Sequence, residues 1–146
     1  MINLKFSAKT YLVLTIAWAI CILIATLTSS GTFEHFHLML LFSFDKPIHF
    51  TLFAAQSWLL IKSLTKNKTK NFILNVFFAC LVCALYGALT EILQGIFVWL
   101  GRGFDYDDIA ADAFGCLIVF VWFWLRRKQF AQDFLLHYIY QNNFLI

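Results

Sequence analysis

The chain has 146 residues, of which 62% are hydrophobic, 19% aromatic and only 13% charged. Soluble domains usually carry about 25% charged residues, so the composition excludes an ordinary soluble domain and predicts an integral membrane protein. The length suits a single domain over residues 1–146. The net charge of +3 comes without the basic–aromatic stripes that bind RNA, so we expect no nucleic-acid partner.

Four apolar stretches have the length of membrane-spanning helices: residues 11–27, 47–64, 72–95 and 108–125. A helix needs about 20 residues to cross a hydrocarbon core of about 30 Å. We therefore predict an all-α fold, a four-helix transmembrane bundle. The first stretch has 17 residues without a charge and no small-x-small site after it, so we expect an anchor and not a cleaved signal peptide.

The second stretch opens with the features of a helix start. Asp45 favours the positive end of the helix dipole, and Pro47 suits the first turn, where its missing N–H would have no partner anyway. His49 and Gln56 are seven residues apart and share a face, one turn beyond Asp45. This polar face should point into the bundle, while Lys62 extends toward the membrane surface.

Small residues recur every four positions along the third stretch and lead to an acid: Ala79, Cys83, Gly87 and Glu91. Small residues let membrane helices approach closely, so this ridge should be the packed face and should carry the acid and Gln94 inward. Residues 72–100 would form a helix of about 43 Å, longer than a simple span. We therefore expect the helix to bend or end near Gly95, with Trp99 and Tyr106 at the membrane surface.

The fourth stretch begins in a run of acids. Asp105 is the expected N-cap, and Asp107 and Asp108 should lie in the first helical turn. Asp112 lies one further turn into the helix, on the same face as Asp108. At that depth it needs a partner such as Arg102, or a proton.

Most basic residues lie on one side of the predicted bundle. Nine of the eleven Lys and Arg residues fall before the first stretch, around the loop after the second, or after the fourth. Basic loops stay in the cytoplasm, which predicts that both termini are cytoplasmic and that the acids gather at the outer end. The aromatic tail, residues 129–146, should lie at the membrane interface.

Two metal-like spacings are expected to be structural. Cys80-x-x-Cys83 has redox or zinc spacing, but no second pair or nearby histidine completes a site. His35-x-His37 has no third ligand nearby. We expect the cysteines to pack within a helix and the histidines to lie in an interfacial loop.

At the outer end we expect eight polar side chains to converge on a substrate-binding site: Asp45, His49, Glu91, Gln94, Arg102, Asp105, Asp108 and Asp112. Imidazole and carboxyl groups suit acid–base chemistry, so His49, Glu91 and Asp108 are the candidate catalytic residues. Together with Asp45 they are also the candidate ligands of a divalent cation, the one cofactor that the pattern indicates. Simpler roles stay open, in which the aspartates only cap a helix and Glu91 and Gln94 only join helices.

Three motifs within residues 45–120 resemble the VanZ-like family of small bacterial integral membrane proteins: Asp45-Lys-Pro-Ile-His49-Phe50, Glu91-Ile-Leu-Gln94, and Arg102-Gly-Phe-Asp105-Tyr-Asp-Asp108 followed by Gly115. One departure is Asp112, which stands where the family usually has Asn. The family is named after a member implicated in resistance to teicoplanin. The resemblance therefore implies a multi-pass protein of the bacterial cytoplasmic (inner) membrane that acts at the cell envelope.

Three functions remain open from the sequence. The first is binding or modifying an outer-leaflet envelope lipid, or altering glycopeptide susceptibility, with Arg102 pairing to an anionic group. The second is an intramembrane enzyme with His49 as base and Glu91 or Asp108 as its partner. Its candidate nucleophiles, Thr51 and Thr90, lie in no triad pattern. The third is a small proton- or ion-coupled transporter. The partners expected in every case are membrane lipids.

Overall fold

The computed structural model describes residues 6–28, 45–66, 71–101 and 103–132, which contain helices and no strand. The helices are α1 (Ala8–Leu27), α4 (Asp45–Thr65), α5 (Phe72–Ile96), the short 3-10 helix η1 (Val98–Leu100) and α6 (Tyr106–Leu125). Among these described helices, α1, α5 and α6 are long and apolar enough to cross a membrane. The chain is therefore a helical membrane protein.

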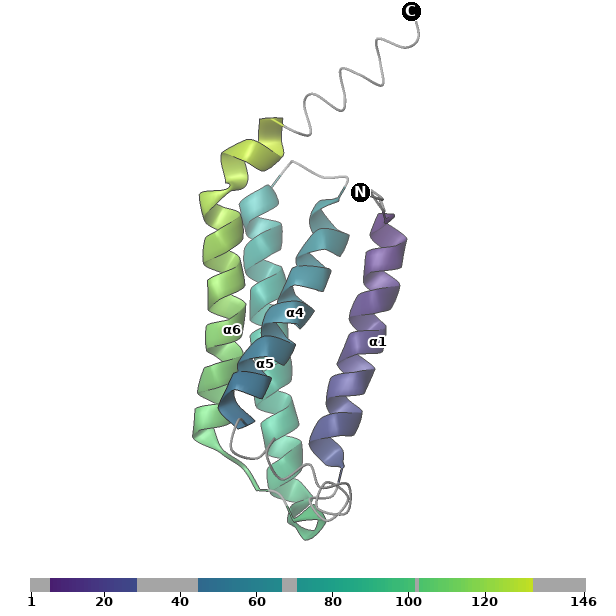
Figure 1. Ribbon diagram of the computed structural model, residues 1–146, viewed down its shortest axis with the longest axis vertical. Coiled ribbons are helices and arrows are strands. Elements are labelled where there is room, and N and C mark those ends of the chain that lie inside the picture. The colour runs from purple at the N-terminus through teal and green to yellow at the C-terminus, as the bar shows by residue number, and fades with distance from the viewer. Residues whose placement is uncertain (1–5, 29–44, 67–70, 102, 133–146) are drawn as a thin grey trace, which may run out of the picture.

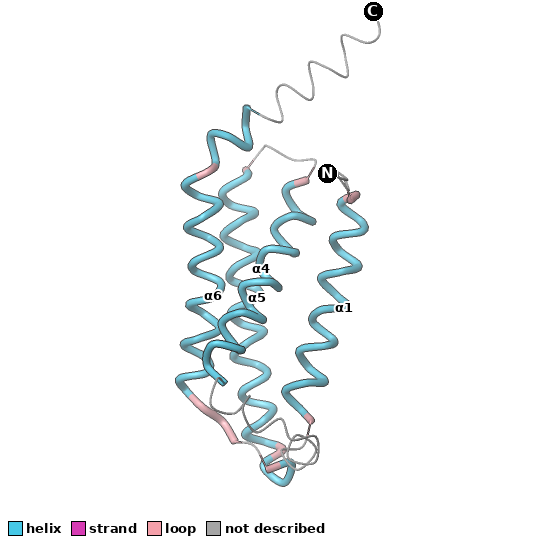
Figure 2. The backbone as a smooth tube through the Cα atoms, viewed as in Figure 1, coloured by secondary structure: helices cyan, strands magenta, loops and turns pink. Residues whose placement is uncertain are grey.

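The long helices run side by side in an elongated bundle (Figure 1). α4 packs against α1, α5 and α6, and α1 stands at one side (Figure 2). α1 begins and α6 ends at the same end of the bundle. At the opposite end, which we call the η1 end, α4 and α6 begin and α5 ends. Three helix ends thus meet there, and the start of α4 is distant in sequence from the other two.

The small-residue ridge of α5 is its packed face, as predicted. Ala79, Cys83 and Glu91 are buried, whereas Leu85 and Leu89 on the other side of the helix are exposed. In a membrane the exposed leucines would contact lipid. The inward direction predicted for Glu91 is therefore confirmed.

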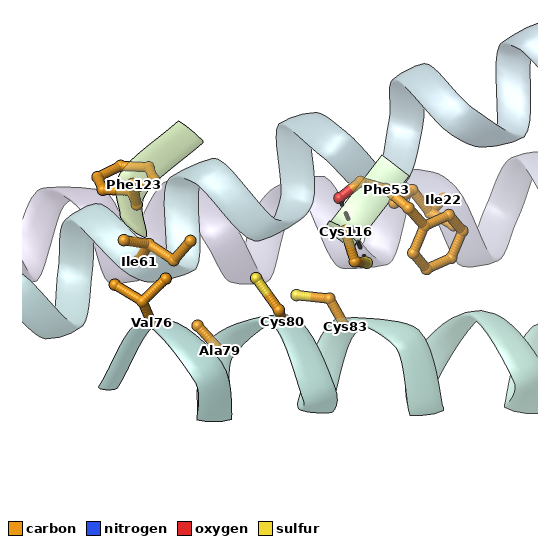
Figure 3. Close-up of a cluster of buried hydrophobic side chains, with 9 residues drawn as sticks. All are labelled: Ile22, Phe53, Ile61, Val76, Ala79, Cys80, Cys83, Cys116 and Phe123. Atoms are coloured by element: carbon orange, nitrogen blue, oxygen red, sulfur yellow. Dashed lines mark hydrogen bonds between the residues drawn. The ribbon is translucent and has the colours of Figure 1, made fainter. Parts of the chain in front are cut away.

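The hydrophobic core lies between α5 and the other three long helices (Figure 3). Its buried side chains are Ile22, Phe53, Ile61, Val76, Ala79, Cys80, Cys83, Cys116 and Phe123. The cysteines are free thiols, and the Cys116 sulfur lies 3.9 Å from the carbonyl oxygen of Phe53. The packing role predicted for Cys80 and Cys83 is thus confirmed. His35 and His37 lie outside the described residues.

Two glycines determine how closely α6 approaches its neighbours. A Cβ atom on Gly87 of α5 would lie 2.6 Å from the Oδ2 atom of Asp112. A Cβ atom on Gly115 of α6 would clash with the carbonyl oxygen of Phe50 and lie 3.1 Å from the backbone nitrogen of Ala54. At Gly87 the space that a larger residue would need is therefore occupied by the Asp112 side chain, and at Gly115 it is occupied by the α4 backbone.

Side-chain hydrogen bonds attach α1 to the rest of the bundle. Trp18 Nε1 donates to the carbonyl oxygen of Leu52 on α4 at 3.1 Å. From α5, the hydroxyl of Tyr86 donates to an α1 carbonyl oxygen at 2.7 Å. Gln94 Nε2 donates to the carbonyl oxygen of Thr26 at 2.9 Å. Polar groups on apolar helices are thus used to fix the position of α1.

The third predicted span ends where expected. α5 stops at Ile96 and is followed by η1, which closes at Gly101 with a left-handed φ of 76°. The predicted end near Gly95 is therefore confirmed. Beside this end, Trp99 and Tyr106 are exposed over 71% and 78% of their surface.

At the end opposite η1, residues 127–132 are helical. The Nζ atom of Lys62 lies 5.3 Å from the ring centroid of Trp58, 5.7 Å from that of Phe123 and 5.1 Å from that of Phe130. Cation–π attraction thus joins α4, α6 and this segment. The remainder of the predicted tail, residues 133–146, lies outside the described residues.

Candidate functional site

The imidazole of His49 lies at the centre of a buried cluster at the η1 end. Only 3% of His49 is exposed. Its Nδ1 atom is 3.0 Å from Asp112 Oδ1 and 3.9 Å from Glu91 Oε1. Its Nε2 atom is 3.8 Å from Asp108 Oδ2 and 3.9 Å from Asp45 Oδ1. Each ring nitrogen therefore faces two carboxyl groups.

Helical spacing on three helices produces this convergence. Asp45 and His49 are one turn apart on α4, and Asp108 and Asp112 are one turn apart on α6, so each pair shares a face. Glu91 comes from the packed ridge of α5. We call His49, Glu91 and Asp112 the inner group, and Asp45, His49 and Asp108 the outer group. Within each group, one nitrogen or oxygen atom per residue lies within 4.8 Å of the others.

Three carboxyl oxygens of this cluster are buried without a hydrogen-bond partner among the described residues: Glu91 Oε1, Asp108 Oδ1 and Asp112 Oδ2. The other oxygen of Glu91 accepts the backbone N–H of Asp105 at 3.3 Å. A buried polar atom with no partner costs free energy, and a buried unpaired charge costs more. The cluster therefore needs protons, ordered water or a cation to satisfy these oxygens.

Lys46 lies at the exposed edge of the cluster. Its Nζ atom is 3.3 Å from Asp105 Oδ2, 3.5 Å from Asp107 Oδ2 and 3.6 Å from Asp108 Oδ1, and half of its side chain is exposed. Lys46 is missing from the set expected from the sequence. Its position next to Asp45 was the available signal, because a residue beside a site acid at a helix start lies at the same end of the bundle.

A model of the VanZ/LLP1 family matches residues 4–127 of the chain. The chain belongs to the VanZ/LLP1 family. The match covers all four long helices and every residue of the cluster. No curated protein matches the chain, and neither does any solved structure.

The residues expected at the site of this VanZ/LLP1 protein fall into four sets. Those that come together in the cluster are Asp45, His49, Glu91, Asp108 and Asp112. Asp105 borders the cluster through its backbone N–H. Gln94 is buried, but the bond that its amide group makes is to α1. Arg102 lies outside the described residues, and the partner that the structure gives Asp112 is His49.

Asp112 occupies the position where the VanZ-like pattern has Asn. The 3.0 Å contact to His49 explains why either Asn or Asp suits this position. The Oδ1 atom of both residues can accept a hydrogen bond from Nδ1–H. Aspartate keeps that acceptor and adds an ionisable group next to Glu91. The departure therefore preserves the hydrogen bond and changes the charge that the inner group can hold.

Neither threonine considered as a nucleophile is directed toward His49 by its hydrogen bond. Thr51 donates to the carbonyl oxygen of Pro47, and Thr90 donates to that of Gly87, each at 2.7 Å. Both bonds return to the helix that carries the threonine, a common pattern for hydroxyls in membrane helices. The structure therefore adds no support for a covalent role of either residue.

Asp105 caps α6, as predicted. Its side chain accepts the backbone N–H of Asp107 at 2.8 Å and also lies beside Lys46. The hydrogen bond from Asp107 is the main reason that the pKa of Asp105 is lowered. Desolvation opposes this effect, and the nearby Lys46 ammonium lowers the pKa further. The ionised cap is thus favoured in the folded protein.

This lowered pKa predicts how the cap responds to pH. The ionised Asp105 stabilises the fold fully above the unfolded-state pKa of about 3.9, and this contribution is lost as pH falls through the lower folded-state pKa. Asp105→Asn keeps a good N-cap and removes the charge. We expect the melting temperatures of the two proteins in detergent to differ by a constant amount from neutral pH to about pH 5, and to converge below about pH 4. A difference that widens on acidification would contradict this assignment.

The hydrogen bond to Asp112 also orients the imidazole. When Nδ1–H donates to Asp112, the lone pair of Nε2 is left facing the outer group. A nitrogen in that state can accept a proton or bind a metal ion. The ring atom that can accept a proton or bind a metal ion is therefore Nε2, which faces the outer group on the side of Lys46.

Proposed function

We propose that this VanZ/LLP1 protein is a four-span, multi-pass protein of the bacterial inner membrane that binds an anionic envelope lipid at the η1 end. Both termini lie in the cytoplasm, and the η1 end faces the outer leaflet. The observation that carries the proposal is the half-exposed ammonium of Lys46 above a buried cluster of imidazole and carboxyl groups. Family membership makes an effect on teicoplanin-type glycopeptides the natural cellular consequence.

The distribution of charge supports this topology. α4 is less apolar than the other long helices, but three of them enclose it, so its polar face need not contact lipid. Most of the described Lys and Arg residues lie at the end opposite the cluster, where α1 begins and where α4 and α6 end, whereas Lys46 lies beside the cluster.

Reporter fusions test the topology directly. We expect a fusion after Lys68 to report a cytoplasmic location and one after Gly103 to report an external location. Labelling of single cysteines introduced at the same positions, in a cysteine-free background, provides an independent check. An external signal after Lys68 would overturn the topology and the outer position of the site.

Phosphate is the anionic group that best suits this end of the bundle. The N-termini of α4 and α6 both lie there, and helix N-termini favour negative charge. Lys46 supplies an ammonium at the same place. From the sequence, Arg102 is expected to add a guanidinium group, whose planar fork suits phosphate oxygens. An envelope lipid with a phosphate or diphosphate headgroup is therefore the proposed ligand.

Binding to lipids of defined headgroup tests this function. We expect Lys46→Gln to weaken binding of a polyprenyl diphosphate, measured by native mass spectrometry, by about 10–150-fold, the range expected for the loss of one charge-assisted contact. Stability should change little, since half of the Lys46 side chain is exposed. Lys66→Gln, at the opposite end of α4, is the matched control and should bind as well as wild type. The proposal would be refuted if wild type, Lys46→Gln and Lys66→Gln bound the diphosphate lipid equally well. It would also be refuted if wild type bound a zwitterionic lipid as tightly as the diphosphate lipid.

An enzymatic role at the same site is the second candidate, favoured by the 3.0 Å contact between His49 and Asp112. The sequence pointed to Glu91 or Asp108 as the partner of His49, whereas the hydrogen-bonded partner is Asp112. A carboxylate that orients an imidazole increases its capacity as a general base. Incubation of purified protein with the bound lipid class, followed by mass spectrometry, would detect a product that His49→Gln fails to make.

A further inference from the structure

The outer group has the arrangement of a metal site with a supporting carboxylate. Metal-binding histidines usually donate their second ring N–H to a carboxylate or carbonyl group, which fixes the ring and its tautomer. In this chain Asp112 Oδ1 lies 3.0 Å from Nδ1, where it can accept this N–H. Nε2 then faces Asp45 Oδ1 at 3.9 Å and Asp108 Oδ2 at 3.8 Å, which is beyond hydrogen-bonding distance of either oxygen.

We propose that Asp45, His49 and Asp108 bind one first-row divalent transition-metal ion, with Asp112 as the positioning residue. The inference deepens the proposed function and rests on it for the outer location of the site. Ligands about 2.0–2.2 Å from a tetrahedral zinc ion are separated by about 3.4 Å. The Nε2 atom of His49 is 3.9 Å from Asp45 Oδ1 and 3.8 Å from Asp108 Oδ2, so shifts of about half an ångström would bring these two pairs to that spacing.

A second observation also indicates a ligand. Asp108 is only 4% exposed, yet its Oδ1 atom has no hydrogen-bond partner among the described residues. The nearest cation to this oxygen in that part of the chain is Lys46, at 3.6 Å. An ion bound by Asp108 would satisfy part of this carboxylate, and Lys46 would remain outside it, available to a headgroup.

The donor atoms select the class of metal. One imidazole nitrogen with two carboxylate oxygens suits Zn²⁺ or Mn²⁺, whereas Mg²⁺ and Ca²⁺ prefer oxygen atoms alone. Three protein ligands leave a coordination position open. That position lies toward Lys46, where a phosphate oxygen of the lipid could bind the ion and the ammonium together.

Zinc titration of the full-length protein in detergent, after removal of metals by a chelator, tests the proposal without any lipid. We expect one Zn²⁺ per chain by calorimetry, at least tenfold tighter than Mg²⁺, and a zinc-dependent rise in melting temperature. His49→Gln and Asp108→Asn should weaken binding by more than about 100-fold. Asp112→Leu should weaken it by about 10–100-fold, the usual effect of losing a supporting partner. Asp112→Asn keeps the acceptor and should retain most of the affinity.

Matched controls separate the outer group from other sites. Asp107→Asn changes an exposed acid in the same helical turn as Asp108, so it should bind zinc like wild type, and Glu91→Gln probes the inner group. Absence of saturable binding by wild type would overturn the proposal. Loss of binding in Glu91→Gln with normal binding in Asp45→Asn would also overturn it. Lipid binding that persists in chelator would leave the proposed function standing without the metal.

Discussion

Replacing His49 with leucine is expected to destabilise the protein by about 3–5 kcal/mol. The imidazole is the group that all the carboxyls of the cluster share, and its Nδ1 atom makes the hydrogen bond to Asp112. Removal of one partner from a buried ionic pair leaves the other uncompensated, and measured losses for such changes fall in this range. Unfolding in a graded series of denaturing detergent gives the free-energy difference.

A second substitution identifies the origin of this loss. In the double variant His49→Leu with Asp112→Leu, the acid that depends most on the imidazole is also removed, so we expect the double variant to be more stable than His49→Leu alone. Asp112→Asn should cost less than either leucine variant, because the hydrogen bond remains. If the double variant lost the sum of the two single effects, the pair would not be coupled and the cluster would not be held by His49.

The other large effect is expected at the contact between α6 and α4. Gly115→Ala should destabilise the bundle by about 1–3 kcal/mol, because the added methyl group would clash with the Phe50 carbonyl oxygen. A rigid backbone group cannot rotate away as a side chain can. The helices must separate, and the separation would move Asp108 and Asp112 away from His49.

Gly103→Ala is the matched control for this substitution. A Cβ atom there would meet nothing within 4 Å, so we expect stability to change by less than about 0.5 kcal/mol. Both variants can be compared by thermal unfolding in the same detergent. Equal melting temperatures would show that the close approach of α6 to α4 does not limit stability.

Short sequence patterns correctly predicted those features of the fold that depend on residues close together in the sequence. The ridge ending at Glu91 showed which face of α5 is packed, since small residues at four-residue spacing fit only a close helix contact. Asp105 was recognisable as a cap because the run of acids ends the polar segment and a helix start needs acceptors for its free N–H groups. Gly95 marked the end of α5 because the apolar run exceeds one membrane thickness.

Contacts between helices could not be derived in the same way. Periodicity indicates which residues of one helix share a face, but it gives neither the rotation nor the height of one helix relative to another. For this reason the hydrogen bond between His49 and Asp112 was not foreseen, and Gln94 was assigned to the site although its amide group bonds to α1. Lys46 was overlooked because its importance depends on acids that α6 brings to it.

The enclosed position of α4 has a consequence for how the protein is made. In the proposed topology α4 spans the membrane, yet among the described long helices it is the one whose composition does not favour crossing. For a newly synthesised α4 on its own, the free energy of insertion into the bilayer would be only weakly favourable. The polar face that is buried in the folded protein would then contact hydrocarbon. Its insertion would therefore depend on α5 and α6, which are synthesised later and cover that face. Stable insertion of α4 would then be completed only when α6 emerges from the translocon. A chain truncated before α6 would therefore be expected to be degraded by quality-control proteases.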